Sequence, residues 1–451
     1  WSAMFTLKKF NTQCEKLSFQ EIRDLAWGLA NPDICFNTSR SLLVDGKLDK
    51  AVLISATLEL AQTHEALRTS FLMLGRNTFK RKIKPLAEVP LEVIDRPQIS
   101  AADPEATDIV RRFSETKFEA TDCPLFRMQI LYLKGGQSIL TMSVAHVVSD
   151  GASLDVLLRD LGMAYAQHAK GMKDSLPKKP FGLSDFVRSH REWMESDDYL
   201  RRLGKIRTKL EPGIGNLAEI AYSCGIDKQV ARKAAVLAHR FPNVAYNKLA
   251  EIAQANRVTM SSAMMAMAAL TLARMLKKRV FFISFMFSNR QYEGIDSMVG
   301  HIANAVPMFV DTVAHGTVSD FVKATSKAFY LSTSSFGLVP LGAINSALAG
   351  LDPVLSLRSP FNMYMINISP SSSPTTEFSG MAARSYSTGY AGYIANDLQL
   401  NYVDSGMDIQ QSCRCPEEQM GNLGQTSIHT FEAALDFALM DNNAPLAAFF
   451  E

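Results

Sequence analysis

Apolar residues recur at two spacings along this chain, and each spacing predicts a different kind of element. Leu154, Leu157, Leu158 and Leu161 fall at positions i, i+3, i+4 and i+7, which places them on one face of a helix. This helix is expected to run from Gly151 to about His168. The same spacing predicts helices over residues 49–71, 107–118, 247–255, 261–276 and 427–439, and a charged helix pair over 186–209.

Short apolar runs predict strands instead. Two such runs, residues 125–133 and 138–144, are separated by Gly135-Gly136, which predicts a hairpin. The run 280–287 is rich in β-prone residues and predicts a buried strand. Weaker patterns predict strands over 91–94 and 397–403, and an exposed loop rich in Ser, Pro and Thr over 368–380.

The order of these elements predicts an α/β fold built from two lobes of similar size. The best candidate for a linker is the segment 171–184, which contains Pro177 and Pro180. We therefore expect an N-terminal lobe over residues 1–175 and a C-terminal lobe over residues 185–451.

Composition narrows the classes of partner. The chain has 451 residues, of which 47% are hydrophobic and 20% charged, so it can bury large cores. Its net charge of +2 indicates neither nucleic acid nor an anionic membrane as a partner. The most apolar stretch, residues 260–273, is too short to cross a bilayer, and residues 1–4 do not begin a secretory signal. We expect a cytoplasmic protein.

The six cysteines are spread along the chain, and only Cys413 and Cys415 lie close together. A Cys-x-Cys pair without nearby histidines or a second pair is a poor zinc site. We therefore expect reduced cysteines and no metal site.

The candidate chemistry lies where the run 138–144 ends. His146, Asp150 and Gly151 follow that run directly and precede the helix described above. Imidazole suits proton transfer near neutral pH because its unperturbed pKa is about 6.5. A glycine lets the backbone approach another group closely. Taken alone, this His-x-x-x-Asp-Gly pattern is a weak signal, because a lone histidine at the end of a strand is more often structural.

Three other segments stand in a set order with this motif. They are His64-Glu65-Ala66-Leu67-Arg68-Thr69-Ser70-Phe71, Pro124-Leu125-Phe126-Arg127 and Val299-Gly300-His301-Ile302-Ala303-Asn304-Ala305-Val306-Pro307. Together with the histidine motif they resemble the ordered motifs of the condensation domains of nonribosomal peptide synthetases. The resemblance extends over about residues 15 to 440.

The resemblance implies two chloramphenicol-acetyltransferase-like lobes in a V, with the histidine motif in a tunnel between them. A donor thioester would enter from one side and an acceptor from the other. The chain departs from the family pattern at Ala145, where the first histidine of a pair is expected, and it matches the initial Ser-x-x-Gln element only in part, through Ser18 and Gln20. These departures indicate a divergent or free-standing member.

The resemblance also assigns roles. His146 matches the second, more important histidine, and we expect it to deprotonate or orient the acceptor. The N–H of Gly151 is a candidate donor to the thioester oxygen. An aspartate before a helix usually accepts backbone N–H groups or pairs with arginine, so we interpret Asp150 as structural, with Arg290 as its implied partner. Asn304 is expected to shape a bridge between the lobes.

Several other polar residues have less specific interpretations. His64 and Arg68 are read as packing and hydrogen-bonding residues. His301 could line the tunnel, but it falls on an unspecified position of the family pattern and is interpreted as coincidental. A basic stretch could contact an acidic carrier protein or simply lie on an exposed strand edge. This stretch comprises Arg76, Lys80, Arg81, Lys82 and Lys84.

The predicted function is that of an acyltransferase. It would join an acyl, polyketidyl or peptidyl thioester to an amine or alcohol, forming an amide or ester in nonribosomal peptide or polyketide biosynthesis. The donor would arrive on the phosphopantetheine of an acyl or peptidyl carrier protein, and no cofactor would be bound permanently.

Two alternatives stay open. The first is a coenzyme A-dependent O-acyltransferase, which shares His-x-x-x-Asp, although its Asp-Phe-Gly-Trp-Gly element is not matched by Asp436-Phe437-Ala438. The second is a catalytically inactive condensation fold that serves as a docking platform, a reading suggested by Ala145.

Overall fold

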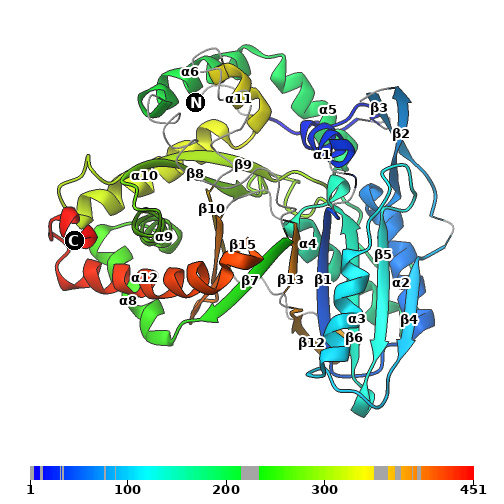
Figure 1. Cartoon of the computed structure of the whole chain (residues 1–451). Helices are drawn as coiled ribbons and strands as arrows, with labels where there is room; N and C mark the ends of the chain where they lie inside the picture. The colour runs from blue at the N-terminus through cyan, green and yellow to red at the C-terminus, as the bar shows by residue number, and fades with distance from the viewer. Residues whose placement is uncertain are drawn as a thin grey trace. The chain divides into compact units, whose positions relative to one another are not determined.

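The computed structural model describes residues 5–10, 14–30, 32, 35–75, 78–86, 88–214, 233–349, 364–370, 377–388, 390–393 and 398–451. The chain divides into two compact units (Figure 1). Unit 1 comprises Trp1–Asp198, Ser288–Ala303 and Ser373–Thr388, and unit 2 comprises Tyr199–Phe287, Asn304–Ser372 and Gly389–Glu451.

This division differs from the expected one in two ways. Unit 1 continues past residue 185 because helix α5 (Leu183–Met194) belongs to it, with Phe186 of that helix packed against Phe5. Unit 1 also takes in two segments from the second half of the chain. Strand β12 (Met381–Tyr386) joins it by pairing with β1 (Asn37–Val44), and residues 288–303 join it through hydrogen bonds to Asp150.

The sheet of unit 1 has six strands in the order β11-β12-β1-β6-β5-β4. Only β4 and β5 are parallel neighbours. The remaining bounds are β11 Glu377–Phe378, β6 Ser138–Ala145, β5 Phe126–Tyr132 and β4 Leu91–Asp95. The hairpin predicted around Gly135-Gly136 joins β5 to β6.

Helices cover both faces of this sheet. The register aligns Leu43, Leu131 and Ile139 on one face, where they form a core with Val110 of α3 (Pro104–Glu115). On the other face Met128 contacts α2 (Lys50–Thr63), and α4 (Gly151–His168) packs against α2. Every residue of β6 is therefore buried, Ser138, Thr141 and Ser143 included, which explains why no exposed polar residue interrupts the segment before His146.

The helix predicted over residues 49–71 is shorter than expected. Helix α2 ends at Thr63, and a 3-10 turn over Glu65–Arg68 leads into β2 (Thr69–Gly75), which pairs with β3 (Thr78–Ile83). Pairing with β3 satisfies the backbone of residues 69–75 and outweighs the helical apolar spacing. Within the basic stretch, Arg81 is buried and pairs with Glu21 at 2.5 Å, so it is not a surface charge; Arg76 lies outside the described residues.

Unit 2 is built on a seven-stranded sheet in the order β13-β7-β15-β14-β10-β8-β9. Strand β10 is parallel to both β14 and β8, and the other neighbours are antiparallel. The bounds are β13 Tyr390–Tyr393, β7 Lys233–Arg240, β15 Ile409–Pro416, β14 Leu398–Asp404, β10 Tyr364–Pro370, β8 Val280–Phe287 and β9 Asn304–Asp311. Residues 368–370, expected in a loop, thus end a strand, because their backbone pairs with β14.

Helix α9 (Met260–Leu276) lies at the centre of unit 2. It is buried from Ser262 to Ala273 and packs against α12 (Met420–Met440), α10 (Val318–Phe336), α8 (Asn243–Asn256) and β10. Small residues and methionines allow this close packing on all sides. The unit also contains α6 (Asp197–Ile214) and α11 (Leu341–Ala349).

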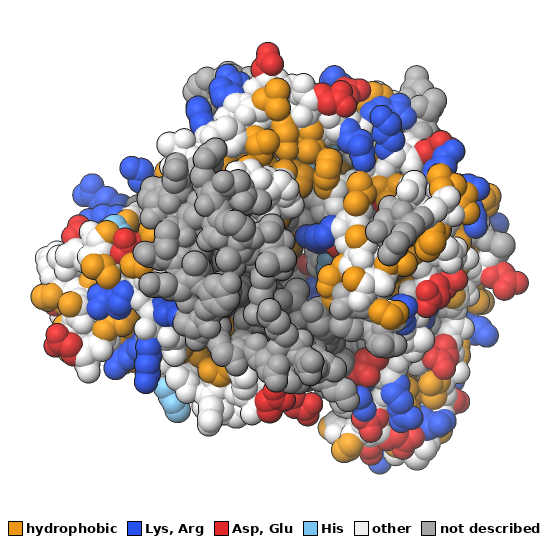
Figure 2. Space-filling model, turned by 45° about the horizontal axis from the view of Figure 1, so that its top comes forward, with side chains coloured by type: hydrophobic (Ala, Val, Ile, Leu, Met, Phe, Trp, Pro, Cys, Tyr) orange, Lys and Arg blue, Asp and Glu red, His pale blue; other side chains and the backbone are white. Residues whose placement is uncertain are grey.

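Two surface properties follow from composition. Basic and acidic side chains are interspersed on the visible face, in line with the near-zero net charge (Figure 2). Among the described helices none is by itself long and apolar enough to cross a membrane, although the bent pair α8–α9 together satisfies that test of length and composition. Five cysteines are free thiols in the described part of the chain, and Cys224 lies outside it.

Candidate active site

His146 is held in place by its backbone and by an aromatic neighbour. It begins a 3-10 turn over His146–Val148 directly after β6. Its N–H donates to the Phe36 carbonyl at 3.0 Å, and its own carbonyl accepts the Ser149 N–H at 3.1 Å. The imidazole stacks on the Phe36 ring with centroids 4.3 Å apart and an interplanar angle of 6°. These contacts leave the ring little freedom to turn.

The two ring nitrogens of His146 have different surroundings. Nδ1 is buried and has no hydrogen-bond partner within 3.5 Å among the described residues. Nε2 forms no hydrogen bond with any described residue. The side chain as a whole keeps 21% of its surface exposed. The ring can therefore present Nε2 to a substrate without breaking a contact within the protein.

Asp150 has all its acceptor positions filled. Its Oδ1 accepts the N–H of Ser153 at 2.8 Å, which caps the N-terminus of α4, and its Oδ2 accepts the N–H groups of Ile302 and Ala303 at 3.1 and 2.9 Å. Arg290 donates to both carboxylate oxygens, at 2.9 and 3.1 Å. Burial alone would raise the pKa of Asp150, but the Arg290 guanidinium and these donors hold it well below its usual value.

Arg290 and Asp150 thus fasten residues 288–303 to the rest of unit 1. The side chain of Arg290 is 10% exposed and also donates to the Met298 carbonyl at 3.1 Å. The hydroxyl of Ser153 donates to the Gly300 carbonyl and accepts the Gly300 N–H, at 2.9 and 3.1 Å. The arginine expected from the second lobe is therefore part of unit 1.

Gly151 offers an open backbone donor. It is the first residue of α4, and no described residue accepts a hydrogen bond from its N–H. It is exposed, and a Cβ built on it would meet nothing within 4 Å. A free N–H at the N-terminus of a helix is a favourable donor to a negatively charged or polarised oxygen.

A group of residues that we call the Asp24 cluster lies beside His146. It comprises Arg23 and Asp24 of α1 (Phe19–Ala30) and His301. His301 Nδ1 lies 2.6 Å from Asp24 Oδ2, and its Nε2 lies 3.2 Å from Arg23 Nη2. Arg23 donates to Asp24 Oδ1 through Nε and Nη2, at 3.1 and 3.0 Å. The His146 and His301 rings are 4.4 Å apart, and His146 Nδ1 lies 3.6 Å from Asp24 Oδ2.

The proton positions in the Asp24 cluster follow from its donors and acceptors. Arginine can only donate, so His301 Nε2 must accept from Arg23, and the His301 proton therefore sits on Nδ1 and points at Asp24. Burial lowers the pKa of His301, against the pull of Asp24, which favours this neutral form. Burial would raise the pKa of Asp24, but His301 and Arg23 hold it well below its usual value, so its carboxylate stays ionised.

Asp24, His146 and His301 also present ligand atoms within 4.8 Å of one another, a spacing that a metal ion could use. The residues fit a metal poorly. The 2.6 Å contact between His301 and Asp24 already contains a proton, and the Arg23 guanidinium occupies the other oxygen of Asp24. We therefore treat the group as a hydrogen-bonded network.

A second buried group, the Asp160 cluster, has the same local construction elsewhere in unit 1. It comprises Arg159, Asp160, His64 and Lys179. Asp160 accepts from His64 Nε2 at 2.9 Å and from Lys179 at 2.7 Å, and Arg159 donates to it through Nε and Nη2 at 3.0 and 2.8 Å. His64 is thus engaged in hydrogen bonding inside the unit, as its predicted structural role requires.

The remaining predicted residues are placed as follows. Asn304 begins β9 in unit 2, where its amide donates to the carbonyls of Gly337 and Val339 at 3.1 and 2.7 Å and fixes the chain after α10. Arg68 donates to the Ala61 carbonyl at 2.7 Å. The interpretation of His301 as coincidental does not account for its place beside His146.

No sequence pattern had pointed to Asp24. Its bond to His301 joins residues 277 positions apart, so no local motif contains both. The signal that could have found it is the burial of polar residues on α1, where Gln20, Glu21 and Asp24 all face inward.

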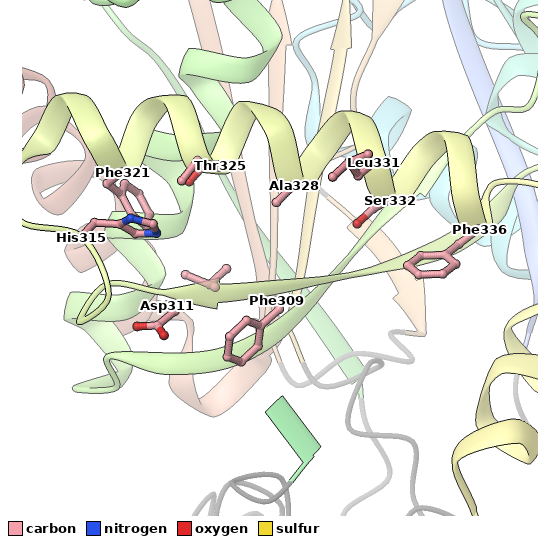
Figure 3. Close-up of a pocket in the computed structure, with 11 residues that line it drawn as sticks. Phe309, Asp311, His315, Phe321, Thr325, Ala328, Leu331, Ser332 and Phe336 are labelled. Carbon is pink, nitrogen blue, oxygen red and sulfur yellow. The ribbon is translucent and has the colours of Figure 1, made fainter. Parts of the chain in front are cut away.

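Unit 2 has a separate cavity of about 260 Å³ between β9 and α10 (Figure 3). Phe309, Phe321 and Phe336 line much of it, and His315 and Asp311 lie at one end. Asp311 already accepts the N–H groups of Val313 and Ala314, at 2.8 and 3.0 Å. Asp311 is thus engaged within the protein, while the polar side chains of His315, Thr325 and Ser332 also line the cavity.

Comparison with known proteins identifies the fold. The chain resembles the first condensation domain of the CDA synthetase, with a TM-score of 0.75 and 20% identity over 97% of this chain and 98% of that one. It also resembles the X-domain from teicoplanin biosynthesis, with a TM-score of 0.79 and 19% identity over 98% of this chain and 99% of that one.

The chain is also similar to parts of longer curated proteins that are named as synthases or synthetases. Gramicidin S synthase 2 of Aneurinibacillus migulanus is 28% identical over 170 residues, which are 38% of this chain and 4% of the relative. Phosphinothricin tripeptide synthetase of Streptomyces viridochromogenes is 24% identical over 411 residues, 87% of this chain and 33% of the relative. The chain thus spans a third or less of these two proteins. The family model for the condensation domain matches residues 29–351. This match, over most of the chain, shows that the protein belongs to the condensation-domain family.

Proposed function

We propose that this protein catalyses amide formation between a carrier-bound acyl or peptidyl thioester and an amine, with His146 as the residue that handles the proton. The amine nitrogen attacks the thioester carbonyl, a C–N bond forms, and the C–S bond to phosphopantetheine breaks. The proton lost by nitrogen passes to His146 Nε2 and then to the departing sulfur. These reaction steps need no bound cofactor.

The observation that carries the proposal is the state of the His146 ring. It is fixed by stacking and backbone contacts, yet Nε2 has no hydrogen-bond partner among the described residues and the ring is partly exposed. A positioned histidine of this kind typically contributes about 10²–10⁴-fold to a rate. In contrast, Asp150 has no acceptor position left for substrate or for His146, which supports a structural role.

The Gly151 N–H supplies the second element of the mechanism. Charge develops on the thioester oxygen as nitrogen attacks, and an open donor at the start of α4 stabilises it. The glycine keeps space for that oxygen to approach because any side chain would occupy it. Loss of one such donor typically costs about 3 kcal/mol of transition-state stabilisation.

Mass spectrometry of acyl transfer tests the proposal. The protein is offered the same acyl group on a carrier protein and on coenzyme A, with a panel of amines and alcohols, beside His146→Ala as the control. Amide formed from the carrier-bound donor by the wild type and lost in the variant supports the proposal. Ester as the main product would change the acceptor class, and equal turnover from acyl-coenzyme A would favour the O-acyltransferase alternative.

Ala145 motivates one competing function, that of a docking platform. The teicoplanin X-domain, which shares this fold, has a solved structure in complex with OxyB. Absence of transfer from every donor, together with retained binding of a carrier protein or another partner, would support the platform and contradict our proposal.

A further inference from the structure

We infer that Asp24 and His301 are positioning residues for His146, and that they supply from distant parts of the chain the support that a second histidine next to His146 would otherwise give. This inference rests on the proposed function of His146. It assigns a role to a carboxylate that no motif contains and to a histidine at an unspecified position of the family pattern.

The first step concerns the orientation of His146. Its Nδ1 is buried and faces Asp24 Oδ2 at 3.6 Å, while Nε2 is on the accessible side. An ionised carboxylate next to Nδ1 favours the tautomer with its proton on Nδ1, which leaves the lone pair on Nε2. The distance is longer than a direct hydrogen bond, as catalytic contacts often are before substrate binds.

The second step concerns the orientation of Asp24. Arg23 holds Oδ1, and the Nδ1–H of His301 holds Oδ2 at 2.6 Å, so the carboxylate cannot turn away from His146. His301 is itself fixed by Arg23 on its Nε2. Asp24 and His301 are each at most 2% exposed at the side chain, so water does not compete for these contacts.

The third step concerns where the imidazole next to His146 comes from. Residue 145, the last of β6, is alanine and therefore carries no imidazole beside His146. The His301 ring lies 4.4 Å from the His146 ring at an angle of 59°, on residues 288–303. The Asp150–Arg290 pair fastens that segment to unit 1, so the structural ion pair and the histidine pair depend on the same piece of chain.

Asp24→Asn tests the inference because it keeps the shape and removes the charge. Asn has one oxygen acceptor, whereas both oxygens of Asp24 receive donors. The amide must therefore turn its NH₂ group either to Arg23 or to the histidines. Asp160→Asn is the matched control, because the same mismatch then arises in a cluster that does not contact His146.

The primary measurement is the ¹⁵N NMR signature of the His146 ring, which does not require turnover. His146→Ala and His301→Gln assign the signals. We expect the Nδ1–H tautomer in the wild type and in Asp160→Asn, and a shift toward Nε2–H in Asp24→Asn. An Nε2–H ring in the wild type, or an unchanged tautomer in Asp24→Asn, would overturn the inference even if acyl transfer is confirmed.

Single-turnover transfer rates complete the test. Asp24→Asn is expected to lower the rate at saturating substrate about 10- to 100-fold, a part of the general-base contribution, with little change in KM. In the His146→Ala background the same substitution should change nothing. An equal loss in both backgrounds would mean that Asp24 acts only on structure. If the wild type itself shows no transfer, the proposed function fails while the NMR result still decides the positioning role.

Discussion

The Asp24 and Asp160 clusters are two versions of one arrangement. In each, an arginine donates two hydrogen bonds to the aspartate that follows it in sequence, and a buried histidine donates one to the other oxygen. The two arginines are similarly exposed, at 43% and 45% of their side chains. The clusters differ in what lies next to the aspartate. Lys179 pairs with Asp160 inside its cluster, whereas the Asp24 cluster lies beside the partly exposed ring of His146.

This difference shows that a buried Asp–His pair is not by itself evidence of catalysis. Burial lowers the pKa of both His64 and His301, and the aspartate partner opposes this effect in both cases. What distinguishes the Asp24 cluster is a neighbouring imidazole with a free nitrogen on its accessible side. We expect substitutions in the Asp160 cluster to change stability alone, and substitutions in the Asp24 cluster to change both stability and the rate of acyl transfer.

The largest effect is expected from Asp160→Ala. It leaves Lys179, which is 11% exposed, without its carboxylate, and breaking such a buried pair costs about 3–5 kcal/mol. Urea unfolding followed by tryptophan fluorescence measures the loss for unit 1, because Trp27 and Trp193 both belong to it. The transfer rate per folded molecule should be unchanged. A lower acyl-transfer rate per folded molecule would contradict the view that the Asp160 cluster affects stability alone.

A matched pair of arginine substitutions should have a smaller effect. Arg23→Met and Arg159→Met each remove partly exposed hydrogen bonds to an aspartate, so both should lower the free energy of unfolding by about 1 kcal/mol. Only Arg23→Met also frees His301 Nε2, and only it should reduce the transfer rate, by several-fold. Similar rates in the two variants would contradict a positioning role for the Asp24 cluster.

Gly151→Ala should barely alter stability. The added methyl meets nothing within 4 Å, and alanine is favoured over glycine in a helix, so unfolding should change by no more than about 1 kcal/mol. The transfer rate should nevertheless fall, because the methyl occupies the space in front of the free N–H. Undiminished transfer would show that the thioester oxygen does not approach this donor.

The smallest expected effect is a shallow pH dependence of stability. His64 and His301 have lowered pKa values in the folded state, whereas the unfolded chain takes up protons near pH 6.5. The unfolded state therefore binds more protons as pH falls from 7 to 5, and stability falls with it. His64→Gln and His301→Gln should each flatten this slope, measured as the urea midpoint against pH. A slope that neither variant changes would show that folding does not shift the pKa of either ring.

The sequence predicted the segment from His146 to Gly151 but not the bond between Asp24 and His301, and the reason is physical. The strand before His146 and the helix after Gly151 produce local periodicities, and their positions agree with β6 and α4. The partner of Asp150 was inferred from family resemblance. The bond from Asp24 to His301 leaves no local trace, because it joins residues 277 positions apart on a helix and a loop.

The lobes show the same contrast at a larger scale. The spacing of apolar residues in α9 and the apolar run of β8 could be recognised from the sequence because most side chains of these elements are buried. The membership of residues 288–303 and 373–388 in unit 1 depends on hydrogen bonds and strand pairing with residues far away in sequence. The division expected from the linker at 171–184 places these residues in the C-terminal lobe, whereas the structure places them in unit 1.

The most direct test of the account compares two histidines in one assay. Single-turnover transfer from the carrier-bound donor is measured for His146→Ala and for His64→Ala, with each rate divided by the folded fraction. The account predicts a loss of about 10²–10⁴-fold for His146→Ala and an unchanged rate per folded molecule for His64→Ala. Equal rates in the two variants, or transfer that survives in His146→Ala, would contradict it.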